Sequence, residues 1–261
     1  MLGQLDILDT KCADLVAEAI ADDRVGLDVQ GIHAASNTDQ ILYGECSAHL
    51  TGSDGCMYGA SDFVPLLEIL GETPMLDRHV LALVLDMLEA DPHAVLGCNL
   101  SAHNLVDAAT WNVILRQVAA RAQLANRLVL ELTETRALKD LTLSAMMLAD
   151  IRRLGCRVAL DDFGTGFASP EVLRLTPVDI VKIDASFLWD IHRSPNGGDS
   201  LSHMVGLAGC FAPIVVIEGV ESEDEANCAR GAGATHLQGY HLSQPVKGCK
   251  AKHVASEGVV S

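Results

Sequence analysis

The chain has 261 residues, of which 49% are hydrophobic, and its 35 acidic against 18 basic residues give a formal net charge of −17 at pH 7. This acidity argues against a duplex nucleic-acid binder, which needs a basic face, and against attraction to anionic membranes. The length is normal for one (β/α)8 barrel.

The eight cysteines and ten histidines are scattered along the chain, with no C-x-x-C pair and no H-x-x-x-H pattern. Such spacing predicts free, buried thiols in a reducing compartment and gives no indication of a zinc site. No apolar run is long enough to span a bilayer, and the N-terminus lacks a signal-peptide profile. We therefore expect a cytoplasmic protein without a membrane segment.

The first half of the chain is predicted to begin with a helix and two strands. Apolar residues recur on one side of residues 1–22, and apolar and polar residues alternate at 25–30. The predicted elements are a helix at 1–22, strands at 25–30 and 40–45 around a turn at 36–39, a Gly- and Ser-rich loop at 51–59, helices at 61–70 and 74–90, a strand at 94–100 and a helix at 105–122.

In the second half, short apolar strands alternate with helices. The strands are predicted at 128–134, within 157–167, and at 178–184, 214–218 and 235–238, and the helices at 141–154, 169–174, 199–211 and 223–231, with a flexible loop at 194–198. This order predicts an α/β fold, a TIM-like (β/α)8 barrel in one domain over 1–261, with 246–261 as a loose tail. Two strands precede the first helix pair, so we expect the first strand to pair antiparallel.

One stretch of the sequence indicates chemistry most directly. The apolar run Val158–Leu160 stops at two adjacent carboxylates, Asp161 and Asp162, and Gly164 and Gly166 follow at once. Two like charges at a strand end are costly unless a positive group lies between them, and a divalent cation with oxygen ligands is the obvious candidate. The alternative is a strand followed by an acidic surface turn.

Polar residues end seven consecutive predicted strands. They are Glu45, Asn99, Glu131, the pair Asp161 and Asp162, Lys182 with Asp184, Glu218 and Gln238. In a parallel barrel these strand ends meet on one face, where such enzymes hold their active sites. Five carboxylates cannot share a cavity without compensation, and two Mg²⁺ or Mn²⁺ ions would supply it.

The chemistry that this set supports is metal-dependent hydrolysis of a phosphate ester, because two metals can together activate a water and neutralise a phosphoryl group. Lys182 would orient the attacking water or accept its proton. A structural ion pair between Lys182 and a nearby carboxylate is the alternative, and both roles are compatible.

These residues resemble the EAL-domain family, bacterial phosphodiesterases of cyclic di-GMP, over nearly the whole chain from Gln30 to Pro245. The resemblance is carried by Asn99-Leu100-Ser101, Glu131-Leu132-Thr133-Glu134, Asp161-Asp162-Phe163-Gly164-Thr165-Gly166, Lys182-Ile183-Asp184, Glu218-Gly219-Val220-Glu221 and Gln238-Gly239-Tyr240 followed by Pro245.

The resemblance implies hydrolysis of cyclic di-GMP to linear pGpG at a site with two Mg²⁺ or Mn²⁺ ions. It also implies that Asp162 lies between or beside the metals, that Lys182 serves the nucleophilic water, that Gln238 completes the site and that Glu134 shapes the loop after Asp162. The metal ligands that it implies are Glu45, Asn99, Glu131, Asp161, Asp162 and Glu218.

Departures from the family pattern cluster at the second strand. The signature Glu-Ala-Leu reads Glu45-Cys46-Ser47, the substrate-contacting Arg falls at His49, and the aromatic after it falls at Leu50. The Gln-Pro near the first strand reads Gln30-Gly31. The residues expected to contact the dinucleotide are Gln30, Ser47, His49, Asp184, Gln238 and Pro245.

Three functions are compatible with this resemblance. The first is an active cyclic di-GMP phosphodiesterase, and the second is a non-catalytic receptor for the dinucleotide or a protein. The third is a different metal-dependent barrel phosphodiesterase with a smaller substrate. The resemblance also implies a homodimer formed near the loop after Asp162, and further regulatory domains in a longer protein.

Overall fold

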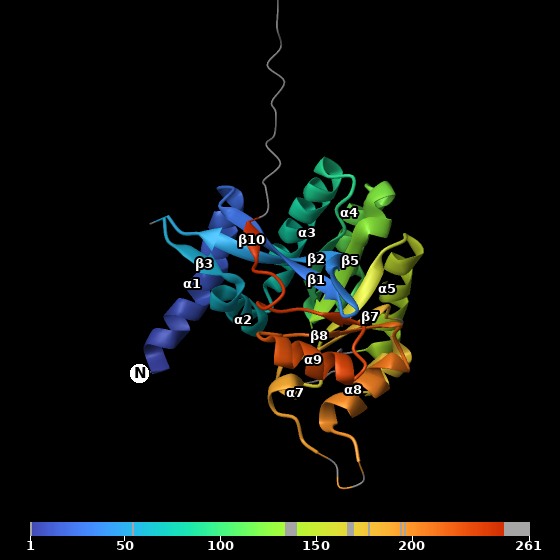
Figure 1. Ribbon diagram of the computed structural model, residues 1–261. Coiled ribbons are helices and arrows are strands. Elements are labelled where there is room, and N and C mark those ends of the chain that lie inside the picture. The colour runs from blue at the N-terminus through green and yellow to red at the C-terminus, as the bar shows by residue number, and fades with distance from the viewer. Residues whose placement is uncertain are drawn as a thin grey trace, which may run out of the picture.

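The computed structural model describes residues 2–53, 55–133, 140–165, 170–176, 178–193, 195 and 197–247, without the side chains of 2–10 and 170–172. Glu134 therefore lies outside the described residues. Figure 1 shows the strands surrounded by helices, and the pairing of the strands closes them into a barrel. The predicted α/β barrel is confirmed.

Eight strands close the barrel. They are β1 (Val25–Ala34), β2 (Asn37–Thr51), β4 (Leu96–Ser101), β5 (Leu128–Thr133), β6 (Arg157–Phe163), β7 (Ile180–Ile183), β8 (Ile214–Ile217) and β9 (His236–Leu237). Neighbours from β2 through β9 pair parallel, whereas β1 pairs antiparallel with both β2 and β9. The expectation of an antiparallel first strand is thus confirmed.

The helices cover the outside of the barrel (Figure 1). They are α1 (Leu2–Ala21), α2 (Ala60–Leu70), α3 (Thr73–Ala90), α4 (Ala108–Ala119), α5 (Leu141–Arg153), α6 (Pro170–Leu175), α7 (Ser186–Trp189), α8 (Ser200–Gly209) and α9 (Glu223–Gly231), with 3₁₀ turns at Ala102–Leu105 and Ala122–Arg127. None of those described is long and apolar enough to cross a membrane.

Two apolar cores hold this architecture. The larger core packs the outward side chains of the strands against the helices. Parallel strands covered on both faces are apolar along their whole length, which explains the nearly continuous apolar runs of β5 and β8. The smaller core fills the inside of the barrel with Ile32, Tyr43, Val129, Ala159, Ile180 and Val216. The inner core closes the barrel, so polar side chains on the inner face collect above it.

The structure corrects several predicted boundaries. The predicted loop at 51–59 contains the end of β2 and a short strand β3 (Met57–Gly59), which pair antiparallel. The predicted helix at 105–122 begins only at Ala108, because the Asp107 carboxylate caps it by accepting from the backbone N–H groups of Ala109 and Thr110. The tail begins with a strand, β10 (Val246–Lys247), paired with β1.

The cysteines also differ in part from expectation. Cys46, Cys98 and Cys156 are buried free thiols, as predicted. Cys210 and Cys228 are also free but exposed.

Candidate active site

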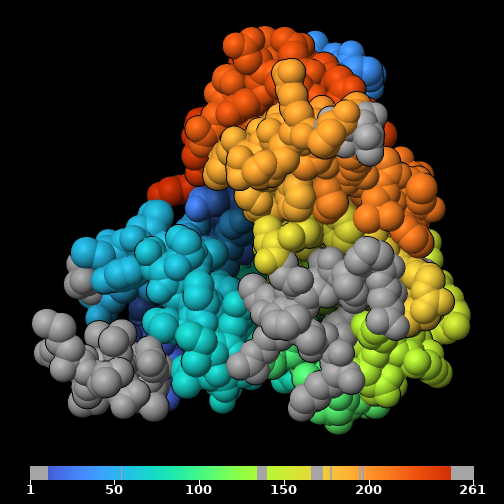
Figure 2. Space-filling model, turned by 90° about the horizontal axis from the view of Figure 1, so that it is seen from below, coloured from blue at the N-terminus to red at the C-terminus, as the bar shows by residue number. Residues whose placement is uncertain are grey.

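The polar strand ends do meet at one end of the barrel, which we call the mouth. Glu45 lies on β2, Asn99 on β4, Glu131 on β5, Asp161 and Asp162 on β6, and Lys182 on β7, while Glu218 and Gln238 directly follow β8 and β9. We call Glu45, Glu131, Asp161, Asp162 and Glu218 the acidic cluster. Figure 2 shows this face hollowed between the cyan helices α2 and α3 and the yellow end of β6. Blue segments of the chain form the floor of the hollow.

Lys182 lies at the centre of the acidic cluster. Its side chain is fully buried, and its Nζ lies 2.9 Å from a carboxylate oxygen of four residues, namely Glu45, Glu131, Asp161 and Glu218. An ammonium group has three protons, so it cannot give each of four carboxylates its own hydrogen bond. Full ionisation of all four carboxylates around this one cation would leave an excess of negative charge in the cluster.

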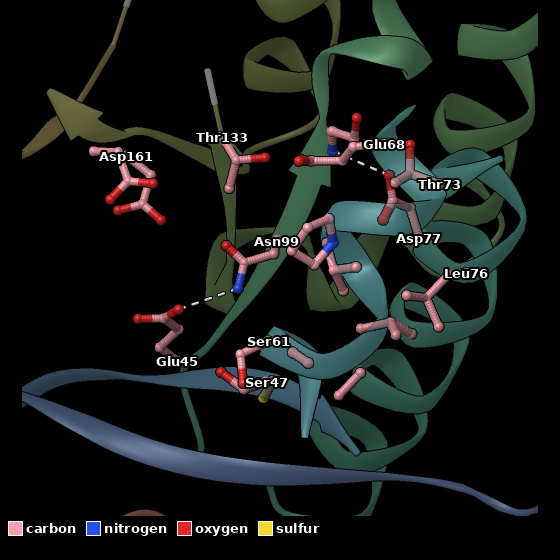
Figure 3. Close-up of a pocket in the computed structure, with 18 residues that line it drawn as sticks. Glu45, Ser47, Ser61, Glu68, Thr73, Leu76, Asp77, Asn99, Thr133 and Asp161 are labelled. Carbon is pink, nitrogen blue, oxygen red and sulfur yellow. Dashed lines mark hydrogen bonds between the residues drawn. The ribbon is translucent and has the colours of Figure 1, made fainter. Parts of the chain in front are cut away.

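The carboxylates form two overlapping groups. Ligand atoms of Glu45, Glu131 and Asp161 lie within 4.8 Å of one another, and so do those of Asp161, Asp162 and Glu218. In Figure 3, Glu45 and Asn99 point toward one another, joined by a hydrogen bond of 3.1 Å from the Asn99 amide, and Asp161 faces the same space from β6. Because both groups share Asp161, they are two adjacent candidate positions for a cation.

A backbone irregularity lets two consecutive residues contribute to the cluster. Side chains on a regular strand alternate between faces. The pairing of β6 with β7 shifts register between Leu160 and Phe163, and Asp162 has a positive φ of 54°. Left-handed backbone is uncommon outside glycine, although Asp and Asn tolerate it. The bulge thus keeps Asp161 and Asp162 on the same side of the sheet, at the mouth.

Gly97 is required by close approach within the barrel. A Cβ at this position would lie 2.1 Å from Glu131 Oε1 and 2.6 Å from the ring of Tyr43. Any side chain at Gly97 would therefore displace the Glu131 carboxylate, and the glycine makes room for it.

The charges of the cluster are unequally distributed. Burial would raise the pKa of Glu45, but Lys182 and hydrogen bonds from Gln238 and Asn99 lower it to about 2. Burial and the neighbouring Glu45 raise the pKa of Glu131 to about 8. Burial lowers the pKa of Lys182, but the carboxylates, led by Asp161, outweigh it and raise that pKa well above its usual value. Lys182 is consequently held protonated.

The neighbouring carboxylates follow the same pattern. Burial raises the pKa of Asp161 and of Glu218, and burial with the adjacent Asp161 raises that of Asp162 to about 6. A proton taken up by the cluster is therefore held by one of the other carboxylates rather than by Glu45.

Gln238 ties β9 to the two antiparallel strands. Its Nε2 donates to Glu45 Oε2 at 2.7 Å and to Gln30 Oε1 at 3.3 Å, while Gln30 Nε2 donates to the Ser243 carbonyl at 2.9 Å. The structure therefore brings Gln30 and Gln238 to the acidic cluster.

The remaining predicted contact residues lie farther out. The Asp184 carboxylate accepts from the backbone N–H of Ser186, at the start of α7, so it has a local structural partner. Pro245 is exposed just before β10. Ser47 is exposed and lines a cavity of about 300 Å³ beside the cluster, whereas His49 is turned toward Asp28 on β1.

This cavity contains residues that the sequence reasoning missed. It extends from Glu45 and Asp161 to α2 and α3, and Thr133, Ser61, Thr73 and Asp77 are among its lining residues (Figure 3). Asp77 had a recognisable pattern, because it is an acidic residue on the apolar stripe of α3, between Leu76 and Val80. An acid at such a position indicates a buried polar contact.

Asp77 fixes the segment after β4 by hydrogen bonds. Its Oδ2 accepts from the Ser101 backbone N–H at 3.0 Å and from Asn104 Nδ2 at 2.6 Å. Burial raises the pKa of Asp77 to about 7, against the lowering effect of these two bonds. The folded protein therefore keeps a proton that the unfolded chain loses from about pH 4 upward, so this contribution to stability is full below pH 4 and is lost as the pH rises to about 7.

Asp77→Asn should remove this loss, because an amide accepts the same bonds without ionising. Asp77→Asn should thus have a higher unfolding free energy than the wild type. This gain is expected to be about 1–3 kcal/mol larger at pH 8 than at pH 5. Urea unfolding at both pH values measures it, with the exposed Asp39→Asn as the matched control. An equal effect at both pH values would show that Asp77 is ionised throughout.

The barrel and the cluster at its mouth define a TIM-barrel protein with a candidate metal centre. The chain belongs to the EAL domain family, which matches residues 14–245. The resemblance found in the sequence is thereby confirmed.

Individual relatives agree with this assignment. A protein of Caulobacter vibrioides described as an uncharacterized signaling protein is 34% identical over 185 residues, 70% of this chain and 23% of that protein. Cyclic di-GMP phosphodiesterase PdeF of Escherichia coli is 29% identical over 209 residues, 78% of this chain and 28% of PdeF. This chain thus spans about a quarter of the length of these relatives.

The fold likeness extends to solved structures. The PaMucR phosphodiesterase in complex with c-di-GMP superposes with a TM-score of 0.76 at 23% identity, over 90% of this chain and 97% of that one. At this level of identity the comparison supports the barrel fold alone.

Proposed function

We propose that the chain is a metal-dependent phosphodiesterase that opens one phosphodiester bond of cyclic di-GMP to give linear pGpG. The observation that carries the proposal is the acidic cluster around Lys182, in which two overlapping carboxylate groups share Asp161. The relative PdeF, which is named a cyclic di-GMP phosphodiesterase, supports the choice of substrate.

The residues present fit two divalent cations. Four carboxylates contact one ammonium group, and both Glu131 oxygens are buried without a hydrogen bond of good geometry to any described residue. The buried Oδ1 of Asn99 also lacks a donor in the described part of the chain and could serve as a neutral oxygen ligand. The proposed ligands are Glu45, Asn99, Glu131, Asp161, Asp162 and Glu218. When bound, such ions lower the pKa of a coordinated water and offset phosphoryl charge.

Lys182 is the proposed proton-handling group. Since the carboxylates hold it protonated, it first acts as a donor that orients a water or phosphate oxygen. It can accept a proton only when the charges of those carboxylates are engaged elsewhere, because they are what raises its pKa. Gln238 holds Glu45 in place by its 2.7 Å hydrogen bond and so orients one proposed ligand.

The receptor alternative finds no support at the cluster, since every carboxylate that the proposed chemistry needs is present there. Glu134 as the residue that shapes the following loop, the homodimer, a cytoplasmic location and further regulatory domains stay predictions.

Hydrolysis of cyclic di-GMP with Mg²⁺, Mn²⁺ or EDTA tests the proposal. We expect pGpG with either metal and none after chelation, with the far-UV circular dichroism largely unchanged, because the carboxylates lie on strands that the apolar cores already hold. Binding of cyclic di-GMP without hydrolysis in any metal would indicate a receptor. Hydrolysis of bis-p-nitrophenyl phosphate alone would indicate another phosphodiesterase, and unfolding on chelation would contradict a preformed site.

A further inference from the structure

Strands β1 and β2 extend the mouth away from the acidic cluster. Directly opposed residues of an antiparallel pair project from the same face. The register places Gln30 opposite Glu45, and Gln30 and Glu45 both belong to the Gln238 network. The next pair on this face is Asp28 with Ser47, which lines the cavity, and the pair after it is Gly26 with His49. The three pairs form a rim that a ligand at the acidic cluster would extend along.

His49 does not project freely from this rim. Its Nδ1 lies 3.2 Å from Asp28 Oδ2, a close contact without the geometry of a hydrogen bond, and its side chain is only 12% exposed. Its other nitrogen, Nε2, rests on Gly26, where an added Cβ would lie 2.4 Å away. Both ring nitrogens therefore face β1, and the glycine provides the space in which the imidazole lies flat on the strand.

Asp28 is the acidic residue in contact with this ring. Its side chain is 31% exposed at the rim, and it reaches His49 diagonally across the strand pair, past Ser47. On its other side the register places Lys247 of β10, which is exposed and on the same face. Asp28 thus lies between two basic side chains, and the structure pairs it with His49.

We infer that Asp28 is a positioning residue for ligand binding, because it holds the His49 side chain against β1 and keeps position 49 from donating to a phosphate at the mouth. This inference rests on the proposed function, since it takes a phosphodiester as the ligand. Asp28 also adds a negative charge to a rim that would receive an anion, and it weakens binding for that reason too.

The pair of positions 28 and 49 should consequently be non-additive. Arginine makes paired hydrogen bonds to phosphate, but it makes the same paired bonds to a carboxylate. An arginine at position 49 alone would be engaged by Asp28. With Asp28→Asn the guanidinium loses that partner and becomes available to the ligand.

A double-mutant cycle tests this with four proteins: the wild type, Asp28→Asn, His49→Arg and the double variant. Affinity for cyclic di-GMP is measured by calorimetry with Ca²⁺, which takes the same oxygen ligands as Mg²⁺, and chromatography verifies that the ligand stays intact. We expect His49→Arg alone to change the dissociation constant less than about threefold and the double variant to lower it at least about tenfold, beyond the product of the single effects.

Two further arms separate this role from a structural one. With Mg²⁺, the change should appear in KM more than in kcat, because the Lys182 cluster is untouched. Asp39→Asn, at the far end of the same hairpin, removes an equal charge and should leave the affinity unchanged.

Three results would overturn the inference. His49→Arg alone could tighten binding as much as the double variant, or the double variant could bind no better than the wild type. The effect of Asp28→Asn could also vanish in Lys247→Ala, which would show that Asp28 acts through Lys247. A wild type that neither binds nor hydrolyses cyclic di-GMP would instead refute the proposed function.

Discussion

Lys182→Met is expected to lower the turnover of cyclic di-GMP by roughly 10²–10⁴-fold, the usual contribution of a positioned proton-transfer group. Binding of the dinucleotide should persist, because the acidic cluster stays in place. In EDTA, however, the variant should be less stable than the wild type by roughly 3–5 kcal/mol, since four largely buried carboxylates lose their only cationic contact among the described residues. Mn²⁺ should restore most of that stability.

Steady-state kinetics and urea unfolding with EDTA or Mn²⁺ measure both effects. Lys11→Met, on the exposed side of α1, is the matched control and should change neither. Turnover near that of the wild type would show that Lys182 is a structural ion-pair partner and that another group serves the water.

Glu131→Gln is expected to change stability and activity in opposite directions. The side chain is fully buried, and burial together with Glu45 raises the pKa of Glu131 to about 8. Folding at neutral pH must therefore protonate a carboxylate that is ionised in the unfolded chain, and a neutral amide of the same shape avoids that cost. In EDTA the variant should gain about 1–3 kcal/mol of unfolding free energy. With metal it should lose at least roughly 100-fold in turnover, more than an outer-sphere change typically causes, because it removes a proposed anionic ligand.

The comparison needs the same four conditions, namely kinetics and unfolding with and without Mn²⁺, and Glu89→Gln on the exposed face of α3 as the control. Stabilisation by Mn²⁺ should be smaller in Glu131→Gln than in the wild type. A fall of stability in EDTA together with the fall of activity in Mn²⁺ would mean that Glu131 serves the fold rather than the metals.

The barrel and the centre of its site could be predicted because both depend on local patterns. Apolar runs such as Leu128–Leu130 mark buried strands, and the polar residue that ends each run marks one end of a parallel sheet. The strand ends alone therefore predict that Asn99, Glu131 and Lys182 converge, without any information on their contacts.

The rim could not be predicted, because it depends on strand register. Asp28 and His49 are 21 residues apart and meet diagonally across the β1–β2 hairpin, whose pairing shifts near His33. A one-residue change in that pairing would place His49 on the opposite face. Alternation within each strand identifies a face, but it does not identify the partner.

Other differences have local causes that the sequence pattern left ambiguous. The bulge that brings Asp162 beside Asp161 depends on left-handed backbone at Asp162. Aspartate tolerates this conformation, but its presence in a sequence does not predict it. Helix α4 begins later than predicted because Asp107 caps it. Aspartate is a recognisable cap residue, but the predicted start followed the apolar periodicity instead.

The closure of the barrel gives the molecule one side that opens more easily than the rest. Only two residue pairs join β9 to β1 and only two join it to β8, whereas six join β4 to β5. Local opening should therefore cost least around β9, where Gln238, the residue after the strand, is joined to Gln30 of β1 by a 3.3 Å hydrogen bond. Such an opening carries Gln238 away from Glu45 while Glu131 and Lys182 remain on well-paired strands. The mouth can thus open locally at β9 while the charged residues on β5 and β7 keep their positions.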